Sequence, residues 1–402
     1  MDVAYELARN VVKTKYENIP AAAIEATKMS ILDTLGVIAA ASTLGQGCKE
    51  IVDLVKESRA KGESTIIGHG GRVPSWMAGL ANGAMTHPLD YDDVREEARV
   101  HPGSCSVVAA FAAAEEVGEV NGKEFLTAVT VAIDLVSRMG LSIVQSSHGH
   151  ATDWHLPPTL GIYAATAAAG KIFGLNEDQM LDAFGHTLQQ VAGSMAYMYS
   201  PGSVFRGIRD GFTIKDGMLS AIMAKKGLPG IKESMESKAG LFNLYFKGWY
   251  ERSYLTDGLG KRFEGINVSF KPWPACRGTH PAIDATLGIL SEDGIQPDDI
   301  AEINVWVSEP ARFVVEPLAE RRAPQTIIDA RLSIPFALGV AVAKNRVTLK
   351  DFTESGLKDP AVLKIARKVT GKVSPELKTN LMRSIVEVKT KDGRQLTKDV
   401  DP

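Results

Sequence analysis

Hydrophobic and polar positions follow two different patterns along the chain, and the change falls near residue 258. Before it, apolar residues recur over segments of a dozen positions or more, which is typical of helices. After it come alternating or β-branched runs typical of strands, at 267–274, 301–308, 383–390 and 394–400. The pattern predicts a mainly α protein with a large all-helical domain over 1–258 and a smaller α+β domain over 259–402.

Six apolar runs of the first part predict helices, at 20–42, 74–87, 106–120, 122–144, 160–175 and 176–196. The run at 20–42 is apolar on nearly every side, so we expect it to be buried among other helices. Asn176, followed by two acids, predicts a helix start. A short strand is expected near residue 65. In the second part, helices are predicted at 281–293, 324–345 and 359–369, and the triplet at 391–393 predicts a hairpin between the last two strands.

Composition narrows the classes of function. With 402 residues, 45% hydrophobic and 23% charged, the chain has the composition of an ordered globular protein. The 45 basic and 48 acidic side chains give a net charge of −3, so no general basic field predicts binding to nucleic acid or to a membrane. The N-terminus lacks the apolar core of a signal peptide, and three scattered cysteines argue against a disulfide framework. We therefore expect a cytoplasmic protein.

The segment 86–104, THPLDYDDVREEARVHPGS, is polar between two apolar helices. It either forms a solvated loop in which Asp90 or Asp93 caps a turn, or it brings Asp90 and His101 to a pocket. In the second case His101 precedes a new helix, which Ser104 would cap and whose N-terminus favours anions.

Histidines crowd the segment 146–161, SSHGHATDWHLPPTLG. The spacing of His148 and His150 invites a metal site, but the βα pattern that accompanies such a pair in barrel hydrolases is missing, so we predict no metal. The alternative is that His155, just before a helix start at Pro157, supplies an acid or a base at neutral pH.

Cations gather in the segment 269–285, SFKPWPACRGTHPAIDA, where a strand is expected to end in Lys271. Arg277 and His280 follow before a helix opening at Pro281, which suits a ligand bearing carboxylate or phosphate. A surface turn with solvated cations is the alternative, and Cys276 is expected to pack rather than react. Arg206 and Arg209 add two cations on a loop before another helix.

The chain shows no Gly-rich phosphate loop, serine nucleophile elbow or nicotinamide fingerprint. The chemistry therefore rests on histidines, carboxylates and cations, and we expect no cofactor. Together these residues indicate proton abstraction or elimination on a polycarboxylate, with cations stabilising the enolate-like charge.

Four segments, at 79–104, 153–176, 209–230 and 269–285, resemble in order and spacing those of the MmgE/PrpD family. That family includes 2-methylcitrate dehydratase, cis-aconitate decarboxylase and iminodisuccinate epimerase. The resemblance covers essentially the whole chain. It implies a helical domain with an α+β lid, a pocket between them, a homodimer, and no metal or organic cofactor. It also implies a helical segment beyond the last hairpin that returns to the first domain, and the sequence ends before that segment.

Matched to the family motifs, the catalytic residues implied by the resemblance are Asp90, His101, His155 and Lys271. The substrate-binding residues implied in the same way are Asp93, Arg206, Arg209, Arg277 and His280. Three positions depart from the family: Val94 replaces a threonine, Arg206 a lysine and Arg209 a histidine. Because arginine keeps its proton at working pH, a base role for that lysine is not reproduced here.

The resulting leading hypothesis is a lyase that removes water from a hydroxy-polycarboxylate after a proton is abstracted next to a carboxylate. His101 and His155 would be the acid and base in an order that the sequence leaves open, and Asp90 would orient His101. The alternatives are an epimerase of an amino- or imino-dicarboxylate, a decarboxylase of a cis-aconitate-like acid, and a non-catalytic binding protein.

Overall fold

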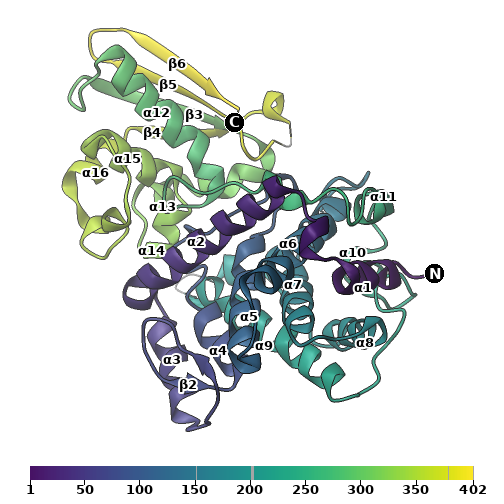
Figure 1. Cartoon of the computed structure of the whole chain (residues 1–402). Coiled ribbons are helices and arrows are strands. Elements are labelled where there is room, and N and C mark those ends of the chain that lie inside the picture. The colour runs from purple at the N-terminus through teal and green to yellow at the C-terminus, as the bar shows by residue number, and fades with distance from the viewer. Residues whose placement is uncertain (151, 201–202, 379, 402) are drawn as a thin grey trace. The chain divides into compact units, whose positions relative to one another are not determined.

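The computed structural model describes residues 1–150, 152–200, 203–378 and 380–401, and divides into two compact units, Met1–Phe270 and Lys271–Pro402 (Figure 1). The first is built from helices with one short hairpin, and the second combines a four-stranded sheet with helices. The prediction of a mainly α protein is confirmed.

The first unit packs its helices around α5, α6, α7 and α9, which contact one another extensively. In chain order its helices are α1 (Val3–Lys13), α2 (Ala21–Leu44), α3 (Cys48–Glu57), α4 (Ser75–Gly83), α5 (Pro102–Val117), α6 (Gly122–Val144), α7 (Leu156–Ile172), α8 (Glu177–Leu188), α9 (Phe205–Lys225), α10 (Leu241–Phe246) and α11 (Arg252–Thr256). The predicted short strand is β1 (Ser64–Thr65), which pairs with β2 (Arg72–Val73). The predicted start at Asn176 is confirmed, because its side chain forms a capping box with Gln179.

Small residues let α9 approach two neighbouring helices closely. A Cβ added at Gly211 would lie 2.4 Å from the carbonyl oxygen of Leu80 in α4. A Cβ at Gly217 would lie 2.6 Å from the carbonyl oxygen of Ile162 in α7. A larger residue at either position would force backbones apart, so these glycines fix the spacing on which the site depends.

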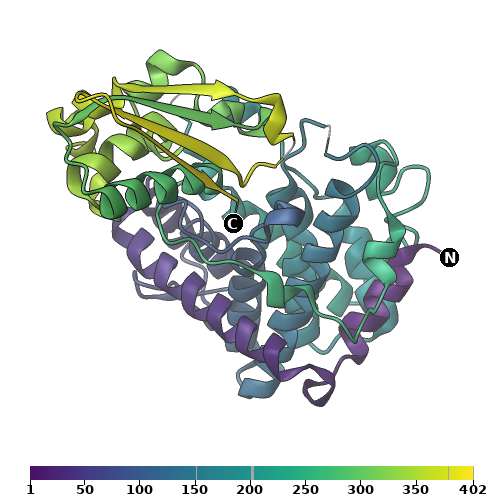
Figure 2. The same ribbon diagram turned by 90° about the horizontal axis from the view of Figure 1, so that it is seen from above.

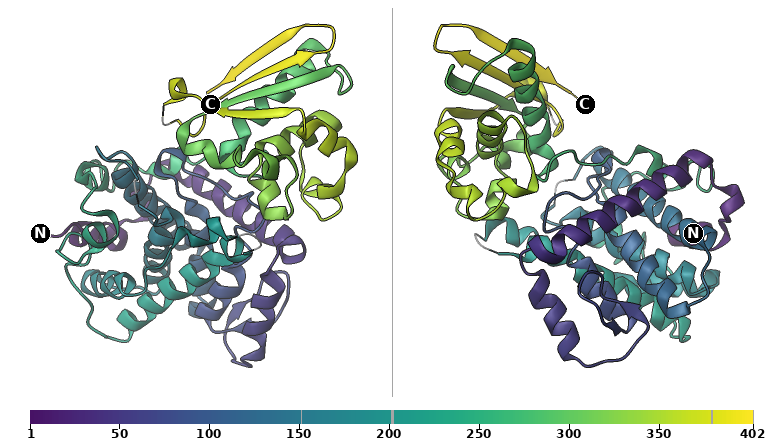
Figure 3. Two further views of the ribbon diagram at one scale, coloured as in Figure 1. Left: turned by 180° about the vertical axis from the view of Figure 1, so that it is seen from behind. Right: turned by 60° about the vertical axis from the view of Figure 1, so that its left-hand side comes forward.

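The sequence predicts that helix α2 is buried on all sides, but one face of it is exposed. Its inner face is covered, but Met29 and Leu32 are 51% and 67% exposed. The right-hand view of Figure 3 shows α2 lying across the outside of the first unit. An apolar run without periodicity predicts burial but does not say which neighbours cover each face, and here they cover only one.

Helix α6 is the long apolar helix of the core. By length and composition it is apolar enough to cross a membrane, but 94% of its apolar window is buried inside the structure. Two charged residues, Asp134 and Arg138, lie on it fully buried and paired, with 2.9 Å between Oδ2 and Nε. Its packing is that of a core helix.

The second unit contains a sheet of order β4-β3-β5-β6, formed by β3 (Ile300–Val307), β4 (Val369–Val373), β5 (Ser384–Thr390) and β6 (Gln395–Val400). Figure 2 shows these strands lying side by side. Helix α12 (His280–Asp293) packs on β5 and β6, and the remaining helices are α13 (Leu318–Arg322), α14 (Ile327–Arg331), α15 (Ile334–Lys344) and α16 (Pro360–Ala366). Alternate residues of β5 are buried, which confirms its predicted half-buried character, and the predicted hairpin joins β5 to β6 antiparallel.

From residue 267 onward two local predictions are wrong and one strand was missed. The segment 267–274 forms no strand and makes only an isolated bridge between Ser269 and Val94, since Pro272 and Pro274 cannot donate to a ladder. The helix predicted over 324–345 breaks between α14 and α15, where Ser333 caps the second helix. Strand β4 was not predicted, and its parallel pairing with β3 makes the sheet mixed.

Candidate active site

The polar segment 86–104 is buried in the first unit, so the interpretation as a solvated loop is wrong. His87, Asp90, Asp92 and Asp93 are each at most 2% exposed. Asp90 adopts a left-handed backbone conformation with φ of 51°, which aspartate tolerates better than most residues. Several charges held away from water in one short segment need specific partners.

Asp90 is paired with Arg206, near the start of α9. The guanidinium donates from Nη1 to Oδ2 and from Nη2 to Oδ1, the second at 3.2 Å. Their side chains are 3% and 12% exposed. Both Arg206 and Arg209 lie in the first turns of α9, so the prediction that they lie on the loop before this helix is wrong. Helix geometry therefore holds this cation, and the bidentate pair fixes its orientation.

Asp92 lies between two histidines. Its Oδ2 is 2.8 Å from Nδ1 of His87 and 3.1 Å from Nδ1 of His101. The same Nδ1 of His101 is 2.7 Å from the carbonyl oxygen of Asp93. Because both groups facing this nitrogen are acceptors, Nδ1 of His101 carries a hydrogen, and Nε2 is the nitrogen that exchanges protons. The prediction that Asp90 orients His101 is thus corrected, since the carboxylate in that position is Asp92.

Asp93 holds the start of α5. Both of its carboxylate oxygens accept from the backbone N–H of Gly103, each at 3.0 Å. His101 occupies the N-cap position without a side-chain cap, and Ser104 lies within the helix, so the predicted cap by Ser104 is wrong. The structure gives Asp93 this helix contact, and its contact with substrate stays a prediction.

Asp93 also makes stability depend on pH. Burial, with the nearby carboxylates of Asp33 and Asp92, raises the pKa of Asp93 well above its usual value. Its folded form prefers the proton, so the stability it contributes is greatest below the unfolded pKa and is lost as pH rises through the folded pKa. We expect Asp93→Asn to gain stability relative to wild type between pH 4 and pH 8, measured by urea unfolding. A difference that stays constant with pH, as expected for the exposed control Asp153→Asn, would contradict this account.

His155 lies at the N-cap of α7, and its Nδ1 hydrogen-bonds the hydroxyl of Tyr197. Its backbone N–H donates to the carbonyl of Gly193 at 2.6 Å. Gly193 has φ of 145°, and a Cβ there would lie 2.4 Å from Oγ1 of Thr159. Only glycine fits this position, and the close backbone contact brings the segment with Tyr197 against His155.

The electrostatic surroundings of His155 favour its neutral form. Burial first, and then the nearby cations Arg209 and Arg206, lower its pKa well below 6.5. His87 responds in the same way, mainly because it is buried. Burial also raises the pKa of Tyr197, so its hydroxyl stays protonated. The site therefore contains two imidazoles in different environments: the neutral imidazole of His155 contacts the hydroxyl of Tyr197, and that of His101 contacts the carboxylate of Asp92. This difference suits separate proton-transfer roles.

Arg209 lies beside these groups with its side chain 1% exposed. Its Nη1 donates to the carbonyl of Arg206 at 2.7 Å, and its Nε is 3.2 Å from Oδ1 of Asp210. Among the described residues, Nε and Nη2 have no acceptor with hydrogen-bond geometry. A buried guanidinium with spare donors is a candidate anion-binding group.

One group of side chains here has the composition of a metal site. The candidate ligand atoms of His87, Asp92 and His101 lie within 4.8 Å of one another. Their separations of 2.8 and 3.1 Å equally suit hydrogen bonds. His148 and His150 have other partners, since His148 stacks on Trp249 and His150 Nε2 lies 2.7 Å from the carbonyl of Trp154. The absence of a required metal stays a prediction.

The remaining predicted residues lie in the second unit. Lys271 is 5% exposed and His280 is 1% exposed, so they are not solvated cations on a surface turn. The Nε2 of His280 is 3.0 Å from the carbonyl oxygen of Ala275, at the start of α12. Arg277 is partly buried in a short 3₁₀ helix, and Cys276 packs against the core of this unit. Their roles toward a substrate stay predictions.

We call His87, Asp92, His101, His155 and Tyr197 the histidine cluster. Sequence reasoning missed three of its residues, His87, Asp92 and Tyr197. His87 and Asp92 belong to the same polar segment as Asp90, and their five-residue separation gives no regular pattern from which their contact could be inferred. Tyr197 follows an apolar helix in an apolar segment, and nothing in its neighbourhood indicates chemistry.

Comparison with known families gives two matches that together span most of the chain. The MmgE/PrpD N-terminal domain matches residues 5–252, and the MmgE/PrpD C-terminal domain matches residues 273–401.

Three curated relatives are similar over nearly the whole chain. A cis-aconitate decarboxylase of Aspergillus terreus is 26% identical, over 96% of this chain and 82% of the relative. A cis-aconitate decarboxylase-like protein of Aspergillus oryzae is 27% identical, over 92% and 79%. The human cis-aconitate decarboxylase is 24% identical, over 93% and 78%.

Proposed function

This chain belongs to the MmgE/PrpD family, and on that premise we propose that it is a lyase which decarboxylates a polycarboxylic acid similar to cis-aconitate. The observation that carries the proposal is a pair of histidines in the first unit with different partners: His101 contacts the carboxylate of Asp92, and His155 contacts the hydroxyl of Tyr197. Arg206 and Arg209 lie within electrostatic range of His155.

Decarboxylation of an unsaturated acid needs two things from a protein. As the bond to the departing CO₂ breaks, its electron pair spreads onto the adjoining carbons and carboxylate, where fixed cations stabilise it. A proton must then be delivered to one of these carbons. Asp92 stabilises the protonated form of His101, so His101 through Nε2 is the group that we assign to this step.

The proposal changes the leading expectation from the sequence. Loss of water needs a base and an acid together, and His155 and His101 are suited to those roles as well. The relatives, however, are named as decarboxylases, and this favours decarboxylation, which the sequence offered only as an alternative to dehydration. Arg206 remains the main departure, since its bidentate contact with Asp90 makes it a fixed charge rather than a base.

We further propose that the second unit contributes cations, Lys271 and Arg277, that bind carboxylates of the substrate, with His280 close to them in the sequence. We also propose that the protein forms a homodimer and is cytoplasmic.

The test is incubation with cis-aconitate and with citrate-like, malate-like and amino-dicarboxylate compounds in deuterated water, followed by NMR. Release of CO₂ with one deuteron in the product is the expected result. An alkene without CO₂ would replace the proposal with a dehydratase, and exchange without either product would replace it with an epimerase. No turnover or exchange across the panel would leave a binding protein.

The same assay tests the metal. We expect a chelator to leave the rate unchanged, because the hydrogen bonds of Asp92 already use the candidate ligands. Stoichiometric metal that is lost together with activity would overturn this expectation.

A further inference from the structure

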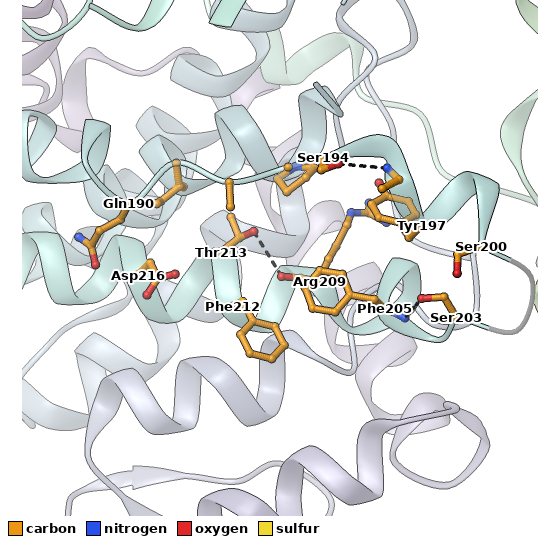
Figure 4. Close-up of a pocket in the computed structure, with 15 residues that line it drawn as sticks. Gln190, Ser194, Tyr197, Ser200, Ser203, Phe205, Arg209, Phe212, Thr213 and Asp216 are labelled. Atoms are coloured by element: carbon orange, nitrogen blue, oxygen red, sulfur yellow. Dashed lines mark hydrogen bonds between the residues drawn. The ribbon is translucent and has the colours of Figure 1, made fainter. Parts of the chain in front are cut away.

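A cavity of about 420 Å³ opens beside the histidine cluster within the first unit. Its walls come from α7, from α9 and from described residues between α8 and α9 (Figure 4). This volume lies in the range of small-molecule sites. Tyr197 is the residue through which the histidine cluster borders this cavity, and most of the wall is formed by other residues, so its shape calls for a separate explanation.

The lining residues follow the same face of two helices. From α7 they are Pro158 and Ile162, which follow His155 by three and seven positions. From α9 they are Phe205, Arg209, Phe212, Thr213 and Asp216, again at helical spacing. Side chains at these spacings share a face. The cavity is therefore a groove along both helices, which spans about 16 Å of α9 from Phe205 to Asp216 and passes Arg209.

The two ends of the groove differ in chemistry. Tyr197 and Arg209 lie toward one end, with Ser200 and Ser203 beyond them in Figure 4, and the hydroxyl of Tyr197 hydrogen-bonds His155. Gln190 and Asp216 lie at the other end in Figure 4, away from Tyr197. The middle is apolar, with Ile162 and Phe212. An apolar chain attached to an acid held at the Tyr197 end would fit this order. A second carboxylate at the far end would have to compete with Asp216 for Lys215, whose Nζ is 3.0 Å from Oδ1 of Asp216.

We propose that the groove binds an apolar arm of the substrate, so that the natural substrate is a carboxylic acid carrying an alkyl or aryl substituent longer than any part of cis-aconitate. This inference rests on the proposed function for the position of the acid. Burying an apolar arm against Ile162 and Phe212 adds affinity for each methylene without any new charge. Residues along the groove then determine specificity, while the histidine cluster carries the reaction.

The test uses 2-alkylsuccinates from methyl to hexyl, which lack the double bond and the leaving group, as probes in calorimetric titration of the full chain. We expect affinity to rise by up to about fourfold per methylene. Ala192→Phe places a large ring in the groove from an exposed position and should abolish this dependence while methylsuccinate still binds. Ala22→Phe, on the exposed end of α2, is the matched control and should keep it.

A second variant, Phe212→Ala, removes part of the wall and should reduce the gain per methylene without closing the groove. Affinity that is flat from methyl to hexyl, or absent throughout, would overturn the inference. So would a chain-length dependence that survives in both Ala192→Phe and Phe212→Ala. The two proposals fail independently. Decarboxylation of cis-aconitate together with an affinity that does not change with alkyl length would reject only the role of the groove. An affinity that rises with alkyl length without any decarboxylation would reject only the proposed reaction.

Discussion

His101→Gln is expected to lower kcat by about 10²- to 10⁴-fold on the acid that the substrate panel identifies, because general acid–base groups contribute that much. Glutamine keeps much of the volume and can still donate toward Asp92 and the carbonyl of Asp93, so the fold should survive. Stopped or continuous assays of turnover, with circular dichroism to verify folding, provide the measurement. A variant that keeps more than a tenth of the rate would place the proton transfer elsewhere.

Asp92→Asn separates positioning from proton transfer. The carboxylate stabilises the protonated imidazole of His101, at 3.1 Å from its Nδ1. Removing the charge should move the limb of the pH–rate profile that reports His101 to lower pH, whether the protonated or the neutral form is the active one. A merely structural role for Asp92 would lower the amount of folded enzyme and leave the profile of the remainder unmoved.

Arg138→Met is expected to cost about 3–5 kcal/mol of unfolding free energy, the largest effect on stability that the structure predicts. Arg138 is fully buried in α6 and pairs with Asp134. Its two terminal nitrogens also donate to carbonyl oxygens of the segment 254–262. The shortest of these hydrogen bonds, 2.6 Å, joins Nη2 to the carbonyl oxygen of Arg262. Methionine fills similar space but leaves a buried carboxylate and several carbonyls without their donor.

Urea unfolding followed by circular dichroism measures this loss. Arg9→Met is the matched control, because Arg9 is 65% exposed in its ion pair with Glu177 and such pairs contribute little. The double variant Asp134→Asn/Arg138→Met should lose less than Arg138→Met alone, since no unpaired charge remains. A loss below about 1 kcal/mol in the single variant would mean that water or a local rearrangement replaces the guanidinium.

Much of the fold follows from the sequence, because its rules are local. The cap at Asn176 and the hairpin between β5 and β6 depend on residues within a few positions of one another. The candidate residues His101, His155 and Arg206 could also be named from the sequence, since polar groups in apolar surroundings are conspicuous. The family was recognisable from motifs in which these residues occur.

Other features depend on how distant segments meet, and only the tertiary structure decided them. Asp92 rather than Asp90 meets His101 because a left-handed residue turns the segment, and no pattern of hydrophobicity encodes that turn. Tyr197 reaches His155 through a backbone contact that Gly193 permits. Strand β4 is defined by its parallel neighbour β3. Sequence patterns thus determine which groups must be buried or capped, whereas the paths of loops and the packing of helices determine which of those groups become partners.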